Sequence, residues 1–229
     1  MYKYKTKYFE ILNKETKINK LLIKICLKAY HKNRDFFQMN SKFFSIQIAN
    51  SEEEFKKLAG KFYDLWVKGV SKEGKIVIIR NFKLYDECYK KFGGTPNFEM
   101  VLTHEINHIF SKQLFLYKGP YWFTEGLAMY VANQIPGKTY HKKVNFSKEK
   151  IKYYLFYRLL MKKLSDEMYI PQYFAVKYLV DNYGKESLLQ LIRMYEESMK
   201  KINYEENFKK IFGLSYTCFL QKFISKFLS

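Results

Sequence analysis

The chain has 229 residues, of which 48% are hydrophobic and 28% charged; this composition suits one folded domain and excludes wholesale disorder. No run of about 18 uncharged apolar residues occurs, so we expect no ordinary transmembrane segment. The formal net charge of +19 suggests nucleic acid, an anionic membrane or an acidic partner. However, almost all the basic residues are Lys rather than Arg, the side chain that base and phosphate recognition favour. We therefore expect a lysine-coated surface and no nucleic-acid binding.

The cysteines and the N-terminus indicate the compartment. Cys26, Cys88 and Cys218 lie far apart with no CxxC or CxxH spacing, so neither a zinc knuckle nor complete disulfide pairing fits. The apolar run 21–27 is too short for an export signal and is interrupted by Lys24. We expect a cytoplasmic protein with reduced thiols, and the sequence leaves its oligomeric state open.

The first part of the chain is predicted to mix helices and strands. Apolar residues opposite lysines predict a basic amphipathic helix over 17–30, which either docks on the core or meets a membrane surface or partner helix. Alternating and β-branched patterns predict strands over 43–49 and 75–82. Between these strands, Ser51 and Glu54 form a capping box that starts a helix running to about residue 58.

Beyond a loop at 87–96 that contains two Gly and one Pro, the apolar period is helical almost throughout. The predicted helices cover 97–111, 124–133, 148–164, 171–183, 185–200, 204–212 and 215–228. The fold class is therefore predicted to be α+β, with an N-terminal lobe (1–96) built on a short mixed sheet and a mainly helical lobe (97–229). No linker composition separates the lobes, so we expect one domain over 1–229.

The most informative motif is HExxH, which lies inside the predicted helix 97–111 as His104-Glu105-Ile106-Asn107-His108. The i, i+4 spacing places His104 and His108 on one face of the helix, where two imidazoles can bind one metal ion. Glu105 lies about 100° around the helix from His104, close enough to act as a general base on a water molecule. The motif therefore predicts a hydrolytic zinc site.

A catalytic zinc ion needs a third protein ligand and an open position for water. The positions at which a metzincin would carry Gly and His hold Ser111 and Leu114, which excludes that class. Glu125 follows His108 by 17 residues and is framed by apolar residues, among which an unpaired carboxylate is costly to bury. We predict Glu125 as the third ligand; the alternative is a carboxylate that faces the dipole of a helix N-terminus.

Together these residues resemble the signature of gluzincin metallopeptidases, in which HExxH is followed by W-x-x-E-G-x-A-x-Y, here Trp122 to Tyr130. The chain is most similar to the small peptidase-MA-like proteins, relatives of the catalytic domain of M1 aminopeptidases. The resemblance implies a zincin-like fold and Zn²⁺-dependent hydrolysis of a peptide or protein substrate. It also implies that the edge strand of the small lobe binds the substrate backbone, and 75–82 is the candidate for that strand.

The segment from Tyr169 to Gly184 resembles a helix of the same family, whose first tyrosine donates to the developing oxyanion. By position that residue is Tyr169, and Tyr173, one turn later, is the second candidate. The segment that holds a free amine in M1 enzymes is not visible, so aminopeptidase specificity is not implied. The alternative function is a catalytically idle or regulatory protein of the zincin fold, which uses its basic surface to bind nucleic acid or an acidic protein.

Overall fold

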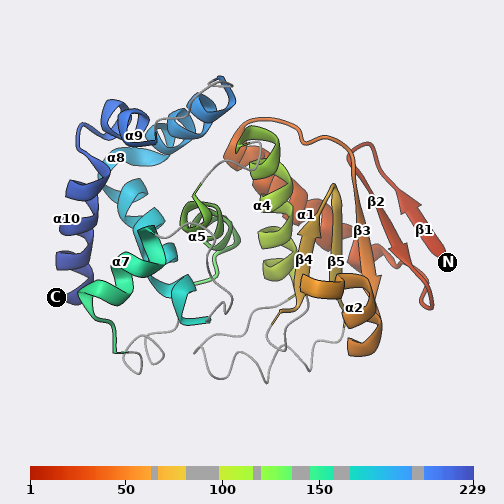
Figure 1. The fold of residues 1–229 in the computed structure, drawn as a ribbon. Coiled ribbons are helices and arrows are strands. Elements are labelled where there is room, and N and C mark those ends of the chain that lie inside the picture. The colour runs from red at the N-terminus through yellow and green to blue at the C-terminus, as the bar shows by residue number, and fades with distance from the viewer. Residues whose placement is uncertain (63–66, 81–97, 116–119, 136–144, 157–165, 198–203) are drawn as a thin grey trace. The chain divides into compact units, whose positions relative to one another are not determined.

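The computed structural model describes residues 1–62, 67–80, 98–115, 120–135, 145–156, 166–197 and 204–229 (Figure 1). Within these ranges the protein is mixed α/β, with a five-stranded sheet and eight α-helices. The predicted combination of a short mixed sheet with a largely helical remainder is confirmed. In the same ranges, no helix is both long enough and apolar enough to cross a membrane. The predicted loop at 87–96 and the ends of several predicted helices lie outside the described residues.

The elements up to residue 79 are β1 (Tyr2–Lys5), β2 (Phe9–Asn13), α1 (Lys20–Phe37), β3 (Phe44–Ala49), α2 (Glu52–Ala59), the 3-10 helix η1 (Gly60–Phe62), β4 (Gly69–Lys72) and β5 (Lys75–Ile79). The later elements are α4 (Phe98–Phe115), α5 (Tyr121–Ala132), α7 (Lys148–Phe156), the 3-10 helix η2 (Asp166–Met168), α8 (Tyr169–Glu197), α9 (Tyr204–Phe212) and α10 (Tyr216–Leu228). The helices predicted over 171–183 and 185–200 are the two halves of α8. They are separated at Gly184, whose φ of 81° is non-helical.

The sheet has the strand order β1-β2-β3-β5-β4. Strand β3 pairs in parallel with β2 and β5, and β1 and β4 add to the two sides as antiparallel strands. The prediction that 75–82 forms the edge strand is wrong, because β5 lies between β3 and β4. The missed strand β4 is one edge of the sheet, and β1 is the other. Strand β4 pairs with β5 through the tight turn at Glu73 and Gly74, both of which have positive φ.

Helix α1 docks on the sheet, which is one of the two alternatives for the basic amphipathic helix. Its inward face is buried and consists of Leu22, Cys26, Ala29, Tyr30, Asn33 and Phe37. The Tyr30 ring contacts Phe9 of β2 and Phe44 of β3 at centroid distances of 5.9 and 6.3 Å. The lysines of the predicted polar face stay exposed, so the amphipathic pattern is explained by packing against the core.

Helix α2 packs against β3 and β5 and starts where the capping pattern placed it. Ser51 Oγ accepts a hydrogen bond from the Glu54 backbone N–H at 3.1 Å. The Glu54 carboxylate does not close the predicted box on Ser51: its Oε2 accepts from the Asn50 backbone N–H, one residue earlier, at 2.9 Å. The cap therefore ties the end of β3 to the start of α2.

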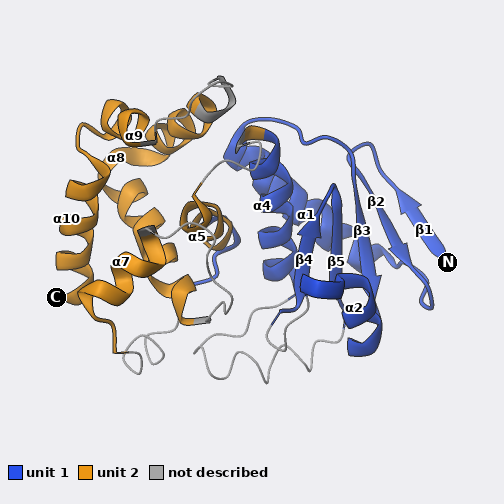
Figure 2. Ribbon diagram, viewed as in Figure 1, with its two compact units in different colours: residues 1–113, 131–137 blue, residues 114–130, 138–229 orange. Residues whose placement is uncertain are grey.

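The chain divides into two compact units, residues 1–113 with 131–137 and residues 114–130 with 138–229 (Figure 2). Most of α4 thus groups with the sheet. In the second unit an aromatic cluster forms the core, and Tyr216 OH donates to the Leu155 carbonyl at 2.6 Å. The cluster comprises Trp122, Phe208, Tyr216 and Phe219.

A buried hydrogen-bond network joins α1 to α4, which lie side by side in Figure 1. Asn33 Nδ2 donates to the carbonyl oxygens of Ala29 at 3.1 Å and Thr103 at 3.0 Å, and Asn33 Oδ1 accepts from Asn107 Nδ2 at 3.0 Å. Ser111 Oγ donates to the Asn107 carbonyl oxygen at 2.7 Å. Both Asn side chains are fully buried. Since buried amides need partners, the network fixes how α4 is rotated against α1.

Replacing Asn33 with Ala should lower the free energy of unfolding by about 1–3 kcal/mol, because it leaves the buried Asn107 amide without its acceptor. Urea denaturation monitored by circular dichroism measures this change. Asn182→Ala is the matched control, since Asn182 makes its hydrogen bond to Tyr178 on an exposed part of α8. The control should change stability by no more than about 0.5 kcal/mol. Equal losses in both variants would contradict a structural role for the network.

Candidate metal centre

The HExxH motif lies in the middle of α4, a helix that is buried nearly all round. Its apolar side chains explain the burial: Val101, Leu102, Ile106, Ile109 and Phe110 are all at most 5% exposed. The polar side chains are carried inside with them, so that His104 is 9% and Glu105 7% exposed. An amphipathic surface helix would leave such groups in water. In α4 the apolar neighbours keep the His104 and Glu105 side chains in an environment from which water is largely excluded.

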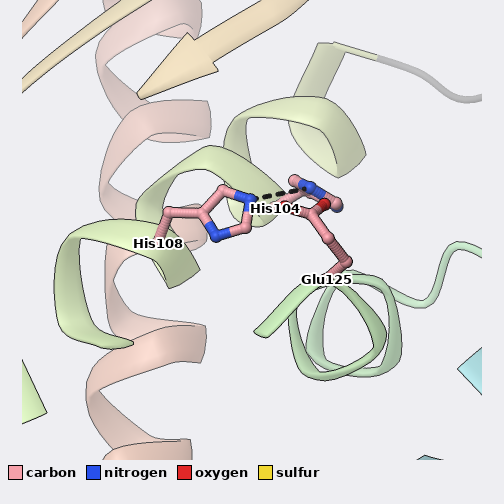
Figure 3. Close-up of side chains that lie close together, drawn as sticks. All are labelled: His104, His108 and Glu125. Carbon is pink, nitrogen blue, oxygen red and sulfur yellow. Dashed lines mark hydrogen bonds between the residues drawn. The ribbon is translucent and has the colours of Figure 1, made fainter. Parts of the chain in front are cut away.

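The structure brings the two predicted histidine ligands together on one face of α4. His104 Nε2 and His108 Nε2 lie 3.1 Å apart, and their rings are nearly perpendicular (Figure 3). Two nitrogens bound to one tetrahedral zinc ion at ~2.0–2.1 Å are separated by about 3.3 Å. The observed separation therefore fits two ligands of the same ion.

Glu125 joins this pair, as predicted. Figure 3 shows its carboxylate beside the imidazoles, and one ligand atom from each of His104, His108 and Glu125 lies within 4.8 Å of the others. Helix α5 begins at Tyr121, so Glu125 is in its second turn, away from the first turn where a carboxylate best faces the dipole. The Glu125 side chain is 8% exposed. Together, the two imidazoles and this carboxylate could hold a metal ion, and they are a donor set that suits Zn²⁺.

The glycine after Glu125 allows α5 to approach α8 closely. A Cβ at Gly126 would lie 2.8 Å from Val176 Cγ2 and closer still to the backbone carbonyl oxygen of Gln172. Because that oxygen belongs to a buried helix, it cannot move aside as a flexible side chain could. The Glu-Gly pair of the signature thus has a local physical reason: the residue beside the ligand has no room for a side chain.

A second glycine contacts the predicted general base. A Cβ at Gly69, the first residue of β4, would lie 2.7 Å from Glu105 Cγ and 3.1 Å from Glu105 Oε1. The backbone of the edge strand therefore lies directly against the Glu105 side chain. Sequence analysis missed Gly69 together with β4. The Glu-Gly turn at 73–74 just before a clear strand was the signal that could have revealed the hairpin.

The two candidate tyrosines lie on the first turns of α8. Tyr169 is its first residue and is half-buried, while Tyr173 is 4% exposed and its ring lies 6.4 Å from that of Tyr130. Burial raises the pKa of Tyr173 above that of an ordinary tyrosine, which already keeps its proton at neutral pH and can donate a hydrogen bond. The assignment of either tyrosine to an oxyanion stays a prediction.

Comparison with known proteins adds no family assignment: no protein-family model matches the chain, and no curated protein does. The link to gluzincins therefore rests on the motif residues and on the arrangement of the three candidate ligands.

The candidate centre predicts one bound metal ion per chain in elemental analysis of the purified protein. His108→Ala and Glu125→Ala should each weaken Zn²⁺ binding more than about 100-fold, because each removes a direct ligand. Loss of a residue that only hydrogen-bonds to a ligand costs roughly 10–100-fold in affinity. Competition with a chromogenic chelator measures the affinity. His31→Ala is the control, since His31 contacts the rings of Tyr8 and Tyr30 instead. Unchanged zinc affinity in either ligand variant would exclude this centre.

Proposed function

We propose that this protein is a zinc-dependent peptidase of the gluzincin type, with a zincin-like fold and a peptide or protein substrate. The observation that carries the proposal is the convergence of His104, His108 and Glu125, whose ligand atoms lie within 4.8 Å of one another. Three protein ligands leave the fourth position of a tetrahedral ion open, which is the arrangement of hydrolytic rather than structural zinc sites. Glu105, adjacent to the first ligand on α4, supplies the base that hydrolysis needs.

When bound, Zn²⁺ supplies Lewis acidity, which lowers the pKa of a water molecule towards about 7 and polarises a carbonyl group. The Glu105 carboxylate accepts the proton of the attacking water and passes it to the nitrogen of the leaving amine. Its contact with Gly69 restricts the side chain before a substrate arrives. Preorganisation of this kind reduces the entropy cost of reaching the transition state.

The edge strand β4 offers a backbone surface beside Glu105. Ile79 N–H donates to the Lys68 carbonyl at 3.1 Å, so the backbone groups of Lys68 point towards β5. In an antiparallel pair, successive residues point their backbone groups alternately towards and away from the neighbouring strand. The backbone groups of Gly69 and Ser71 therefore point away from β5. The Ser71 carbonyl accepts from Lys112 Nζ at 2.5 Å. The Glu105 side chain packs over the face of β4 at Gly69, and the backbone groups of Gly69 that point away from β5 are suited to pair with an extended peptide. We therefore propose that an extended substrate pairs with β4, and not with the segment 75–82 as the sequence predicted.

Glu105→Gln should keep the bound zinc and reduce peptide hydrolysis by about 10²–10⁴-fold, because the amide cannot accept the water proton. Turnover of a quenched-fluorescent peptide library, with zinc content measured in parallel, tests this. Glu99→Gln is the control on the same helix; Glu99 forms an exposed ion pair with Lys28, and the control should hydrolyse peptides normally. Full activity in Glu105→Gln would refute the mechanism.

Gly69→Ala should also retain zinc but lose activity, since the added methyl group displaces the Glu105 side chain. A misplacement of about 1 Å at a reacting group costs on the order of 10²-fold in rate. Steady-state kinetics on the same peptides measure the loss, and Lys72→Ala at the exposed end of β4 serves as the control. Wild-type turnover in Gly69→Ala would contradict the placement of β4 against the general base.

A further inference from the structure

The second ring nitrogen of His104 has a defined partner. His104 Nδ1 lies 2.6 Å from Gln134 Oε1. A carbonyl oxygen can only accept, so Nδ1 carries the hydrogen and donates it. In a neutral imidazole this leaves the lone pair on Nε2, the nitrogen that lies 3.1 Å from His108 Nε2. The hydrogen bond to Gln134 thus leaves the correct nitrogen of His104 ready to bind a metal ion.

The backbone holds Gln134 in place for this contact. Helix α5 ends at Ala132, and Asn133 adopts the left-handed conformation, with φ of 61°, that commonly terminates helices. The Ile135 N–H then donates to the Asn133 carbonyl at 3.0 Å and closes a three-residue turn around Gln134. Asn133 and Ile135 are exposed, whereas Gln134 is half-buried. The turn therefore directs the middle side chain inward, towards His104.

We propose that Gln134 is a positioning residue, which fixes the tautomer and orientation of the His104 imidazole for metal binding. The inference rests on the proposed function because both involve the same metal centre. It addresses the geometry of a ligand, however, and not the catalytic step. Metal-binding histidines usually donate their second N–H to a carboxylate or carbonyl, and losing that partner costs roughly 10–100-fold in metal affinity. A neutral amide orients the ring without stabilising the imidazolium form, which cannot bind metal.

Zinc affinity of the full chain, measured by chelator competition, tests the positioning role. Gln134→Leu should weaken Zn²⁺ binding roughly 10–100-fold, because the side chain keeps its bulk but loses the acceptor. Gln134→Glu keeps an acceptor oxygen and should therefore bind zinc more tightly than Gln134→Leu does. Gln221→Leu, the same change on the exposed face of α10, should have no effect. Wild-type zinc affinity in Gln134→Leu would overturn the proposal.

A spectroscopic signature separates positioning from a merely structural role. Long-range ¹H–¹⁵N correlation spectra of the full chain, with and without zinc, report which nitrogen of His104 carries the proton. The wild type should show the Nδ1–H tautomer in both samples, and Gln134→Leu should lose this preference while its thermal unfolding is unchanged. An Nε2–H tautomer in the zinc-free wild type would overturn the proposal. Failure of the wild type to bind zinc would contradict the proposed function, and the tautomer would still decide the role of Gln134.

Discussion

The need of the polar side chains on buried helix α4 for partners organises this part of the structure. Helix α4 carries Thr103, His104, Glu105, Asn107 and Ser111, all largely removed from water. Thr103 Oγ1 donates to the Glu99 carbonyl at 2.7 Å, and Asn107 bonds to Asn33 of α1. The Thr103 bond stays within α4, whereas the bond between Asn107 and Asn33 crosses to α1 and holds α4 in one rotation. The i, i+4 spacing brings His104 and His108 together on another side of the same helix.

The large positive charge has no evident part in this chemistry. The basic residues outnumber the acidic ones by 41 to 22, but the ion pairs among the described residues, such as Lys28 with Glu99 and Lys177 with Asp181, are mostly exposed. Exposed pairs contribute about 0–1 kcal/mol each. The carboxylates of Glu105 and Glu125 are buried, and a divalent cation would offset the cost of keeping them there. The exposed lysines thus act through a field that salt screens.

The sequence predicted what depends on local spacing and missed what depends on contacts between distant segments. Helical period located α9 at its observed bounds, and HExxH spacing identified His104, Glu105 and His108. The sequence analysis missed strands β1, β2 and β4, which have only four or five residues each. Segments this short carry little pattern of their own, and they become strands by pairing with a neighbour. The sequence analysis also missed Gln134, because only the fold brings this residue into contact with His104, 30 residues away in the chain.

Both carboxylates of the candidate centre are positioned with the help of a glycine. The Glu105 side chain lies against Gly69, and Glu125 is followed by Gly126, where α5 comes close to the backbone of α8. A Glu side chain has several rotatable bonds, and fixing it by hydrogen bonds alone would leave alternative rotamers accessible. Close backbone approach removes the space for those alternatives. A Cβ at Gly69 would therefore move the Glu105 carboxylate, and a Cβ at Gly126 would push α5, which carries Glu125, away from α8.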